Sequence, residues 1–286
     1  MAPTLVLNPA GRKMESLKVL NQPILICFLT ISLMFSVCGS EPYDYMQYVV
    51  QWQPAVCSTP NYHRQKCRKL AKPEFTIHGL WPSKFSGAHV IYCRQQDAFH
   101  INKVHSIRAE LNKCWPDLLP DVPHRYSAVC SRHRGNAGFW CREWQKHGIC
   151  SLFNQREYFN RAVELCTTYN KKIEYILQRN QILASNTRLV KSINISDTIY
   201  EEFGRLPALR CSLRNDYLEG PRQLLEVILC FTVDGKYMID CPQSIIDRPQ
   251  SIRYCPSDIF FLSSATDTLQ SALSWALAAL LLRVAI

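Results

Sequence analysis

The feature that most constrains how this chain can fold is its cysteine content, with fourteen of these residues in a chain of 286. Such a density is typical of proteins that fold in an oxidising compartment, where cysteines pair as disulfides. Two of the fourteen, Cys27 and Cys38, lie in an N-terminal segment that we expect to be removed, which leaves an even number. We therefore predict a secreted domain that is braced by disulfides.

The N-terminal segment, residues 1–40, has the layout of a secretory signal peptide preceded by a short extension. Ile24 to Val37 is a mostly apolar run that is too short to span a bilayer comfortably, and basic residues precede it. The small residues at 38–40 suit a cleavage site. Met14 is an alternative start, because the segment that begins there has this layout on its own. We expect the mature protein to be secreted.

The opposite end, residues 262–286, is a hydrophobic extension. Small residues and a short polar spacer precede a mostly apolar stretch from Leu269 to Ile286, which is short for a membrane span. This arrangement has the form of a lipid-anchor signal, whose tail is removed during processing. An additional amphipathic helix and an error in the gene model are the alternatives. We expect no stable membrane anchor in the mature protein.

The residues between these ends, 41–261, contain no internal repeat, low-complexity tract or flexible linker, so we predict a single domain. An aromatic and β-branched run at Tyr43–Gln53 indicates a strand, and Phe75–Ile77 indicates a short strand that delivers His78 to a turn at Gly79. A strand followed by helices and then a hairpin predicts an α+β fold. The expected helices are Phe99–Trp115, Phe139–Cys150, Gln155–Asn180 and a segment from Ser196 or Asp197 to Phe203, and the expected hairpin pairs Leu225–Val233 with Lys236–Cys241 around Asp234 and Gly235.

The chain is basic, with a formal net charge of +10 and a pI of about 9.0. A basic balance fits a polyanionic partner such as nucleic acid, or an anionic surface. A solvated basic surface gives the same composition, so the charge alone leaves the partner open.

Two short stretches carry residue types that can move protons at a phosphate. They are FTIHGLWP at Phe75–Pro82 and FWCREWQKHGIC at Phe139–Cys150, and each holds a histidine with a tryptophan and a glycine close by. On a helix, Glu143 lies four residues before His147 and three before Lys146, so these side chains share a face. We expect them to reach one ligand.

This set of side chains suits the cleavage of RNA by internal attack. Such cleavage needs a base for the ribose 2′-hydroxyl and an acid for the departing 5′-oxygen, and histidine does either job near neutral pH. Lys146 can stabilise the charge of the transition state, and Glu143 can assist a histidine or the phosphoryl oxygens. Trp81 and Phe139 offer aromatic faces on which bases stack. No metal or cofactor is expected, because the nucleophile belongs to the substrate.

The same residues have plainer interpretations. A single histidine is most often structural, and a tryptophan is more often part of a core than a platform for bases. Cys141, His147 and Cys150 are a conceivable zinc set, but their spacing matches no common zinc signature. A disulfide between Cys93 and Cys150 would instead tie the segment of His147 to the chain that leaves His78. On residue types alone, other hydrolases and disulfide-rich binding proteins remain open.

A resemblance narrows these possibilities. FTIHGLWP and FWxxEWxKHGxC look like the two active-site segments of the secreted ribonuclease T2 family, and the resemblance extends over about Tyr43 to Phe261. QYVVQWQPAVC at Gln47–Cys57 is similar to the start of plant members, especially the S-ribonucleases of pollen–pistil self-incompatibility. The family implies a central antiparallel sheet flanked by helices. It also implies metal-independent cleavage of single-stranded RNA through a 2′,3′-cyclic phosphate to a 3′-phosphate.

The resemblance also implies roles for individual residues. His147 matches the general base of the family, and His78 matches its general acid. Glu143 and Lys146 match residues that stabilise the transition state, and Trp81 matches an aromatic residue of the first base site. Phe139 and Gln51 match residues that line the second base site.

The chain departs from the family pattern at Arg142, where the family usually has a phosphate-binding histidine before the catalytic glutamate. Arginine also binds phosphate, and it does so at any pH. We therefore expect activity, with altered affinity and a less acidic optimum. Ile149 replaces the usual threonine, which we interpret as a change in packing.

The cysteine pattern of the family implies four pairings, and the remaining four cysteines allow three possible connectivities. The implied bridges are Cys57–Cys67, Cys93–Cys150, Cys211–Cys255 and Cys230–Cys241, and the residues left open are Cys114, Cys130, Cys141 and Cys166. Asn194, followed by Ile195 and Ser196, forms a glycosylation sequon that is suited to a secreted surface.

The sequence thus predicts a secreted, monomeric endoribonuclease whose partner is single-stranded RNA. Its biological role stays open between two kinds of enzyme. An S-type cytotoxin would also be read by pollen recognition proteins, whereas an S-like ribonuclease would serve phosphate scavenging, RNA turnover or defence. A catalytically inactive extracellular recognition protein is a further alternative, against which the intact catalytic residues argue.

Overall fold

The computed structural model describes residues 42–59, 67, 71–88, 90–93, 98–119, 129–213, 222–246 and 253–264. The predicted signal segment and the C-terminal extension beyond Ser264 lie outside the described residues. Within these ranges, no helix is long and apolar enough to cross a membrane.

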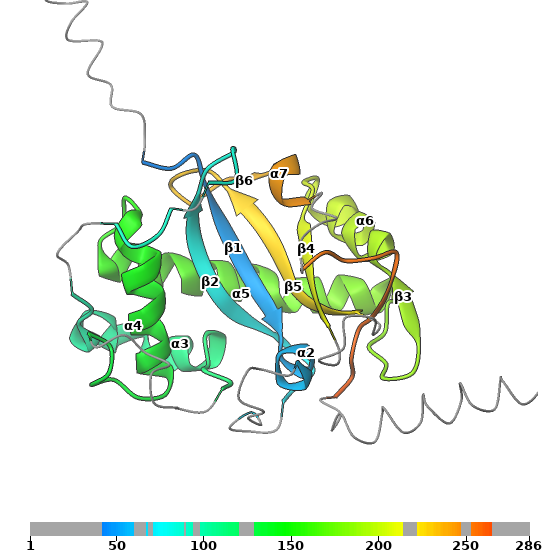
Figure 1. Ribbon diagram of the computed structural model, residues 1–286, viewed down its shortest axis with the longest axis horizontal. Helices are drawn as coiled ribbons and strands as arrows, with labels where there is room; N and C mark the ends of the chain where they lie inside the picture. Colours follow the sequence, from blue (N-terminus) through cyan, green and yellow to red (C-terminus); the bar gives the residue numbers. More distant parts are fainter. Residues whose placement is uncertain are drawn as a thin grey trace, which may run out of the picture. The chain divides into compact units, whose positions relative to one another are not determined.

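The described strands form one sheet of seven, in which β2, β1, β5, β7 and β3 follow one another and β4 and β6 also pair with β5 (Figure 1). The strands are β1 (Tyr45–Trp52), β2 (Phe75–Ser83), β3 (Leu189–Lys191), β4 (Ala208–Leu213), β5 (Arg222–Phe231), β6 (Met238–Ile239) and β7 (Asp258–Phe260). All pairs are antiparallel except β5 with β7. The expectation of a mainly antiparallel central sheet is confirmed.

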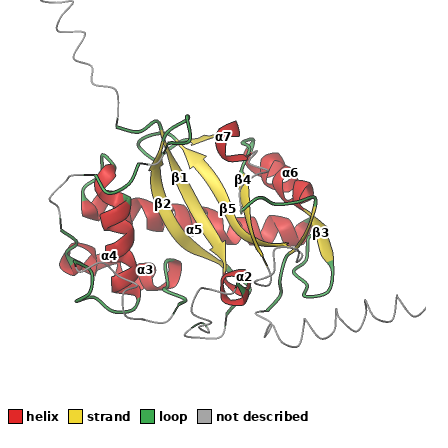
Figure 2. Cartoon of the chain, in the orientation of Figure 1, coloured by secondary structure: helices red, strands yellow, loops and turns green. Residues whose placement is uncertain are grey.

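Helices flank this sheet, which confirms the predicted α+β class (Figure 2). The long helix α5 crosses behind β1, β2 and β5, while α3 and α4 lie on the β2 side and α6 on the β4 side. The helices are α2 (Gln53–Ser58), α3 (Arg108–Cys114), α4 (Asn136–Lys146), α5 (Gln155–Arg179), α6 (Ser192–Phe203) and α7 (Gln243–Ile246), with two 3₁₀ segments, η1 (Ile101–Ile107) and η2 (Gly148–Cys150).

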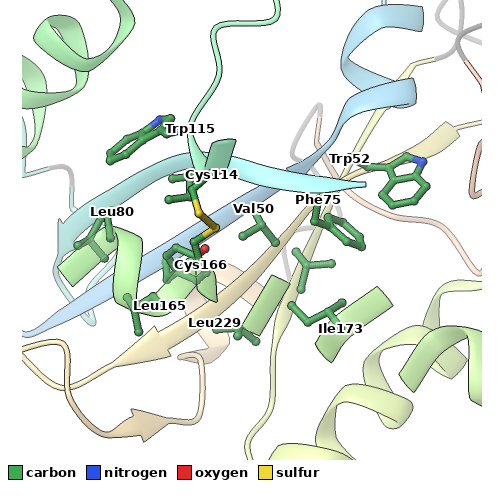
Figure 3. Close-up of a cluster of buried hydrophobic side chains, with 14 of the residues drawn as sticks. Val50, Trp52, Phe75, Leu80, Cys114, Trp115, Leu165, Cys166, Ile173 and Leu229 are labelled. Carbon is green, nitrogen blue, oxygen red and sulfur yellow. A yellow bond between two sulfur atoms is a disulfide. The ribbon is translucent and has the colours of Figure 1, made fainter. Parts of the chain in front are cut away.

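The main core lies between the sheet and α5 (Figure 3). Val50 and Leu229 from the sheet pack with Leu165 and Ile173 from α5, and all four side chains are buried. Burying a side chain of this kind stabilises a fold by roughly 1.5–3 kcal/mol. The core therefore fixes which face of β1, β2 and β5 is turned towards the helix.

Strand β1 is buried on both faces, but its two faces differ in character. Val50 and the other even-numbered residues of the strand belong to the main core. Tyr45 and Val49 on the opposite face belong to a smaller cluster, and Gln47 and Gln51 alternate with them on that face. Because side chains alternate along a strand, the face away from α5 carries polar side chains.

Local sequence explains where α5 begins. The Asn154 side chain accepts a hydrogen bond from the Glu157 backbone N–H at 3.0 Å, and the Glu157 carboxylate accepts one from the Asn154 N–H at 2.9 Å. This reciprocal cap satisfies two N–H groups that have no partner inside the helix. The helix is thereby anchored at the edge of the core that it covers.

Six disulfides join the described elements, and the four pairings implied by the resemblance are all present. The pairing left open is Cys114–Cys166 with Cys130–Cys141. The first of these connects α3 to α5 through the main core, as Figure 3 shows. The structure thus selects one of the three connectivities that the sequence allowed.

Two predictions about the histidine stretches are wrong in detail. Strand β2 continues through His78 to Ser83, so Gly79 lies within a strand and not in a turn. Helix α4 starts at Asn136, earlier than predicted, and ends at Lys146, so His147 caps the helix and does not belong to it. The cause in each case is local packing, which is described with the site below.

Other boundaries also differ from the predictions. The segment predicted as one helix from Phe99 divides into η1 and α3. Helix α6 begins at Ser192, which places Asn194 in an exposed position within the helix, and it ends at Gly204 as expected. The hairpin after β5 has a six-residue connection, because β6 pairs only Ile239 and Met238 with the end of β5. Strands β3, β4 and β7 were not predicted.

Candidate active site

The predicted catalytic side chains line one cleft with a volume of about 670 Å³. His78 and Trp81 reach it from β2, and Glu143, Lys146 and His147 reach it from the end of α4. Residues of β1, β4 and the segment before β7 also line the cleft, including Gln47, Arg210 and Arg253. The fold thus brings together two stretches that are separated by more than fifty residues in the sequence.

The glycine after His78 makes room for this arrangement. A Cβ atom at Gly79 would lie 1.9 Å from Trp81 Nε1 and 2.7 Å from Glu143 Oε2, far inside contact distance. Opposite Gly79 the pairing of β1 with β2 shifts register between Val49 and Val50. We conclude that residue 79 must be glycine because the side chains of Trp81 and Glu143 fill the space that its own side chain would need. The backbone does not turn at this position.

The segment of His147 is held mainly by local contacts. The His147 N–H donates to the Glu143 carbonyl at 2.9 Å as the last turn of α4, and η2 follows directly. A Cβ atom at Gly148 would lie 2.3 Å from the ring of the buried Trp144. The Cys93–Cys150 bridge then closes the segment. These contacts fix the point at which the helix stops and His147 enters the cleft.

Trp81 connects the two stretches. Its Nε1 donates a hydrogen bond to Glu143 Oε2 at 3.0 Å. Its ring stacks on the His147 ring with a centroid separation of 5.0 Å, and it meets the His78 ring edge-on at the same separation. One indole therefore contacts three of the four side chains that the resemblance marks as catalytic.

Three residues predicted to bind substrate lie just outside the cleft lining. Gln51 and Phe139 are buried, with exposed fractions of 7% and 3%. The Arg142 guanidinium lies over the Phe139 ring at 4.8 Å, and its Nε is 3.8 Å from Glu143 Oε1. The Phe139 ring is 6.3 Å from the His78 ring. Phe139 and Arg142 thus lie beside the predicted catalytic side chains, and the contacts of all three residues with substrate stay predictions.

The structure places at the site a carboxylate that the sequence analysis missed. Glu226 of β5 accepts a hydrogen bond from His78 Nδ1, and its side chain is 1% exposed. Arg210 of β4 lies 3.4 Å from the same carboxylate, and Arg253 lies 3.6 Å from it. Glu226 is the single charged residue in the apolar run from Leu224 to Phe231. A buried charge is costly unless it is paired, so a lone glutamate in an apolar strand indicates that the fold supplies a charged partner for it.

The charges around Glu226 have a clear effect on its ionisation. Burial raises the pKa of its carboxyl, but His78, Arg210 and Arg253 outweigh burial and lower the pKa to about 2. Glu226 is therefore ionised at any pH at which the protein is expected to work. Arg210 also donates to Gln47 at 3.2 Å and lies over the Trp81 ring at 5.4 Å.

The zinc alternative is wrong, because Cys141 and Cys150 are both consumed by disulfides. A disulfide sulfur is no longer a thiolate, which is the form that binds zinc. The part of the chain that the structure describes contains no group of three histidine, cysteine or acidic residues placed to hold a metal ion.

Comparison with known proteins agrees with this geometry. A model of the ribonuclease T2 family matches residues 43–241. The chain belongs to this family. Ribonuclease MC of Momordica charantia is 35% identical over 201 residues, covering 70% of this chain and 94% of the relative. Ribonuclease S-6 of Pyrus pyrifolia is 27% identical, covering 75% of this chain and 87% of the relative.

Solved structures confirm the family fold. Ribonuclease MC1 from bitter gourd seeds superposes with a TM-score of 0.60 at 32% identity, covering 77% of this chain and 100% of that one. Ribonuclease NT, solved in complex with 5′-AMP, gives a TM-score of 0.61 at 26% identity, with coverages of 77% and 98%. Since the family consists of metal-independent endoribonucleases, the chain is an endoribonuclease of this type.

Proposed function

We propose that the protein cleaves single-stranded RNA through a 2′,3′-cyclic phosphate, with His147 as general base and His78 as general acid. The observation that carries this proposal is the presence of both histidines, Lys146 and Glu143 on the wall of one cleft. A pair of histidines on either side of a phosphate can accept and donate protons in the same event.

In the first step, His147 removes the proton of the ribose 2′-hydroxyl, whose oxygen then attacks the adjacent phosphorus. The bond from phosphorus to the 5′-oxygen breaks, and the departing oxygen takes a proton from His78. Each of these proton transfers is worth roughly 10²–10⁴-fold in rate. The Lys146 ammonium stabilises the negative charge that gathers on the phosphoryl oxygens.

In the second step the roles reverse. His78, now neutral, takes a proton from water, which attacks the phosphorus of the cyclic phosphate. The bond to the 2′-oxygen breaks, His147 returns its proton to that oxygen, and a 3′-phosphate remains. Glu143 supports both steps from its place beside Trp81, where the indole N–H fixes one carboxylate oxygen.

Substrate binding involves the residues around these groups. Trp81 is proposed to serve the first base site, and Gln51 and Phe139 the second. The Arg142 guanidinium lies over Phe139 and beside Glu143, which is a suitable position for contact with a phosphate. Gln51 and Phe139 are buried, so contact with a base would need their surroundings to open.

We further propose that the protein is secreted, glycosylated and monomeric. The domain would span residues 41–261, with 1–40 removed as a signal and 262–286 as a separate extension. Six disulfides support folding in an oxidising compartment, and the exposed Asn194 supports glycosylation. One relative, ribonuclease LX of Solanum lycopersicum, is named as intracellular, so the compartment needs its own test.

The biological role has two candidates. Several relatives from Pyrus pyrifolia carry S-ribonuclease names, which supports an S-type role with pollen recognition partners. Similarity to ribonuclease MC supports an S-like role in scavenging, RNA turnover or defence. Sequencing of the gene from many individuals separates the two, because only the S-type role predicts extreme allelic variation.

The catalytic proposal is tested by incubating the mature protein with RNA in EDTA. We expect cleavage with cyclic phosphate ends that convert to 3′-phosphates, and loss of cleavage in His78→Ala and in His147→Ala. Full activity in either variant would contradict the assignment. Absence of cleavage by the wild-type protein would favour an inactive recognition protein.

A further inference from the structure

His78 differs from a solvent-exposed histidine in having a buried carboxylate behind it. The carboxylate of Glu226 accepts from Nδ1 of His78, which leaves Nε2 as the ring nitrogen available to a substrate. The His78 side chain is 26% exposed and lines the cleft, whereas Glu226 is 1% exposed. The His78 ring is thus fixed at its Nδ1 edge by Glu226, and its Nε2 edge is available to a substrate in the cleft.

We propose that Glu226 is a positioning residue of this ribonuclease, which orients the His78 ring so that Nε2–H points at the departing 5′-oxygen of RNA. The inference rests on the proposed role of His78 as general acid. It concerns a residue outside the two histidine stretches, on a different strand. Glu226 does not touch the substrate and acts only through His78.

The sheet makes this contact rigid. Glu226 lies opposite Gln51 of β1, and Gln51 lies opposite Thr76 of β2. The carboxylate therefore reaches across β1 to a residue two strands away, and neighbouring strands are about 4.8 Å apart. A glutamate and an imidazole are long enough to span this gap together. An aspartate at the same position is shorter by one methylene group and would not reach.

Two arginines hold the carboxylate on its other sides. Arg210 on the neighbouring strand lies 3.4 Å from Oε2, and Arg253 lies 3.6 Å from Oε1. A buried carboxylate with several partners has little freedom to rotate, because each rotation would break a charged contact. This leaves a competing explanation, in which Glu226 serves only to neutralise the two arginines. The two explanations differ in what they predict for amide and shortened variants.

The test uses two substrates in EDTA. The first is an RNA oligonucleotide of mixed sequence, whose leaving group is an alkoxide that needs a proton. The second is a set of ribonucleoside 3′-(4-nitrophenyl phosphates), whose leaving group departs without one. A residue that positions the general acid affects the first substrate and spares the second. Steady-state kcat and KM are measured for the wild-type protein and for Glu226→Ala, Glu226→Gln and Glu226→Asp.

For RNA we expect kcat to fall by about 30- to 100-fold in Glu226→Ala, with KM changed by less than about threefold. Glu226→Gln should stay within about tenfold of the wild type, because its amide oxygen still accepts from Nδ1–H. Glu226→Asp should behave like the alanine variant, although it keeps the charge. With the nitrophenyl substrates all three should lie within about threefold of the wild type.

The control is Gln223→Ala. Gln223 is a fully buried polar residue of the same strand, and it donates to Ala55, Thr59 and Ser212 outside the cleft. We expect this variant to be less stable, with kcat on RNA unchanged. If Glu226→Ala does not fold, the comparison of the glutamine and aspartate variants carries the test, with folding checked by circular dichroism.

Three results would overturn the proposal. They are wild-type kcat on RNA in Glu226→Ala, equal losses on both substrates, and an aspartate variant more active than the glutamine variant. Failure of the proposed function looks different, because then His78→Ala itself keeps its activity on RNA. The experiment thus separates two failures. In one, His78 is the general acid but Glu226 has no effect on it; in the other, His78 is not the general acid.

Discussion

The two histidines of the cleft, for which we propose roles in proton transfer, are held by different physical means. His78 sits within a strand, is partly exposed, and is fixed by the side chain of Glu226, which lies 148 residues away in the sequence. His147 caps a helix and is 6% exposed. Its ring stacks on Trp81, and the bridge at Cys150 follows within three residues.

One cleft therefore combines a long-range anchor for His78 with a local anchor for His147. The long-range anchor is electrostatic, so we expect it to respond to pH and to the loss of one charge. The local anchor consists of helix geometry, ring packing and a covalent bridge, so we expect it to respond to changes of volume. Substitutions near His78 should therefore act through charge and pH, whereas substitutions near His147 should act through packing volume.

The largest expected effect concerns pH and the charge behind His78. In the unfolded chain the carboxyl of Glu226 has its ordinary pKa of 4.5, whereas in the folded protein its pKa is about 2. The stability that this difference supplies is complete above pH 4.5 and is lost as the pH falls through about 2. Between these limits the wild-type protein should lose roughly 3 kcal/mol more unfolding free energy than Glu226→Gln.

This prediction is checked by denaturant unfolding of both proteins at several pH values across that window. Gln223→Ala serves as the control, because it removes buried hydrogen bonds from the same strand and leaves Glu226 in place. Its stability should follow the same pH dependence as that of the wild type. Parallel curves for the wild type and Glu226→Gln would mean that the long-range anchor is not electrostatic.

Gly79 and Gly148, which directly follow the two histidines, allow each anchor to be tested by a single added methyl group. In Gly79→Ala the new Cβ would meet Trp81 and Glu143, so both of these side chains must shift. We expect kcat/KM on RNA to fall about 100-fold, the cost of a displacement near 1 Å at a reacting centre. In Gly148→Ala the Cβ meets the buried ring of Trp144, so we expect a loss of roughly 1–3 kcal/mol in unfolding free energy.

Activity and unfolding are measured on both glycine variants below their unfolding temperatures. We expect Gly79→Ala to be the less active variant and Gly148→Ala the less stable one. If Gly148→Ala were the less active variant and Gly79→Ala the less stable one, Gly79 would not mainly serve the cleft and Gly148 would not mainly serve the core.

The smallest expected effect is that of Trp81→Phe. Phenylalanine keeps a ring against His147 but removes the Nε1 donor to Glu143. We expect kcat to fall about tenfold, which corresponds to one charge-assisted hydrogen bond. A rise in KM with unchanged kcat would indicate that Trp81 acts mainly as a base platform and not as a support for Glu143.

How far the sequence could predict this site follows from the same contrast. The spacing of Glu143, Lys146 and His147 was enough to place them together, because a helix repeats locally. The contact between Glu226 and His78 depends on the order β2, β1, β5, which no local pattern encodes. The prediction of a turn at Gly79 is wrong because glycine occurs both in turns and at close approaches of side chains. Only the position of the Trp81 indole shows that the second reason applies here.

The fold divides in the same way. Strand β1 and helix α5 were predicted near their observed bounds, because each has a strong local pattern of apolar residues. The short strands β3 and β7 have three residues each, and pairing between segments far apart in the chain defines them. The predicted hairpin around Asp234 and Gly235 is confirmed, because β5 and β6 pair on either side of it and the Gly235 N–H donates to the Thr232 carbonyl at 2.7 Å.

The most direct test of the account compares His78→Ala and His147→Ala on RNA and on ribonucleoside 3′-(4-nitrophenyl phosphates) in EDTA. On RNA both variants should lose roughly 10²–10⁴-fold in kcat. On the nitrophenyl substrates His78→Ala should recover to within about tenfold of the wild type, and His147→Ala should not, because attack by the 2′-hydroxyl still needs a base. Recovery of His147→Ala instead of His78→Ala, or equal losses of both variants on both substrates, would contradict the separate roles of the two histidines.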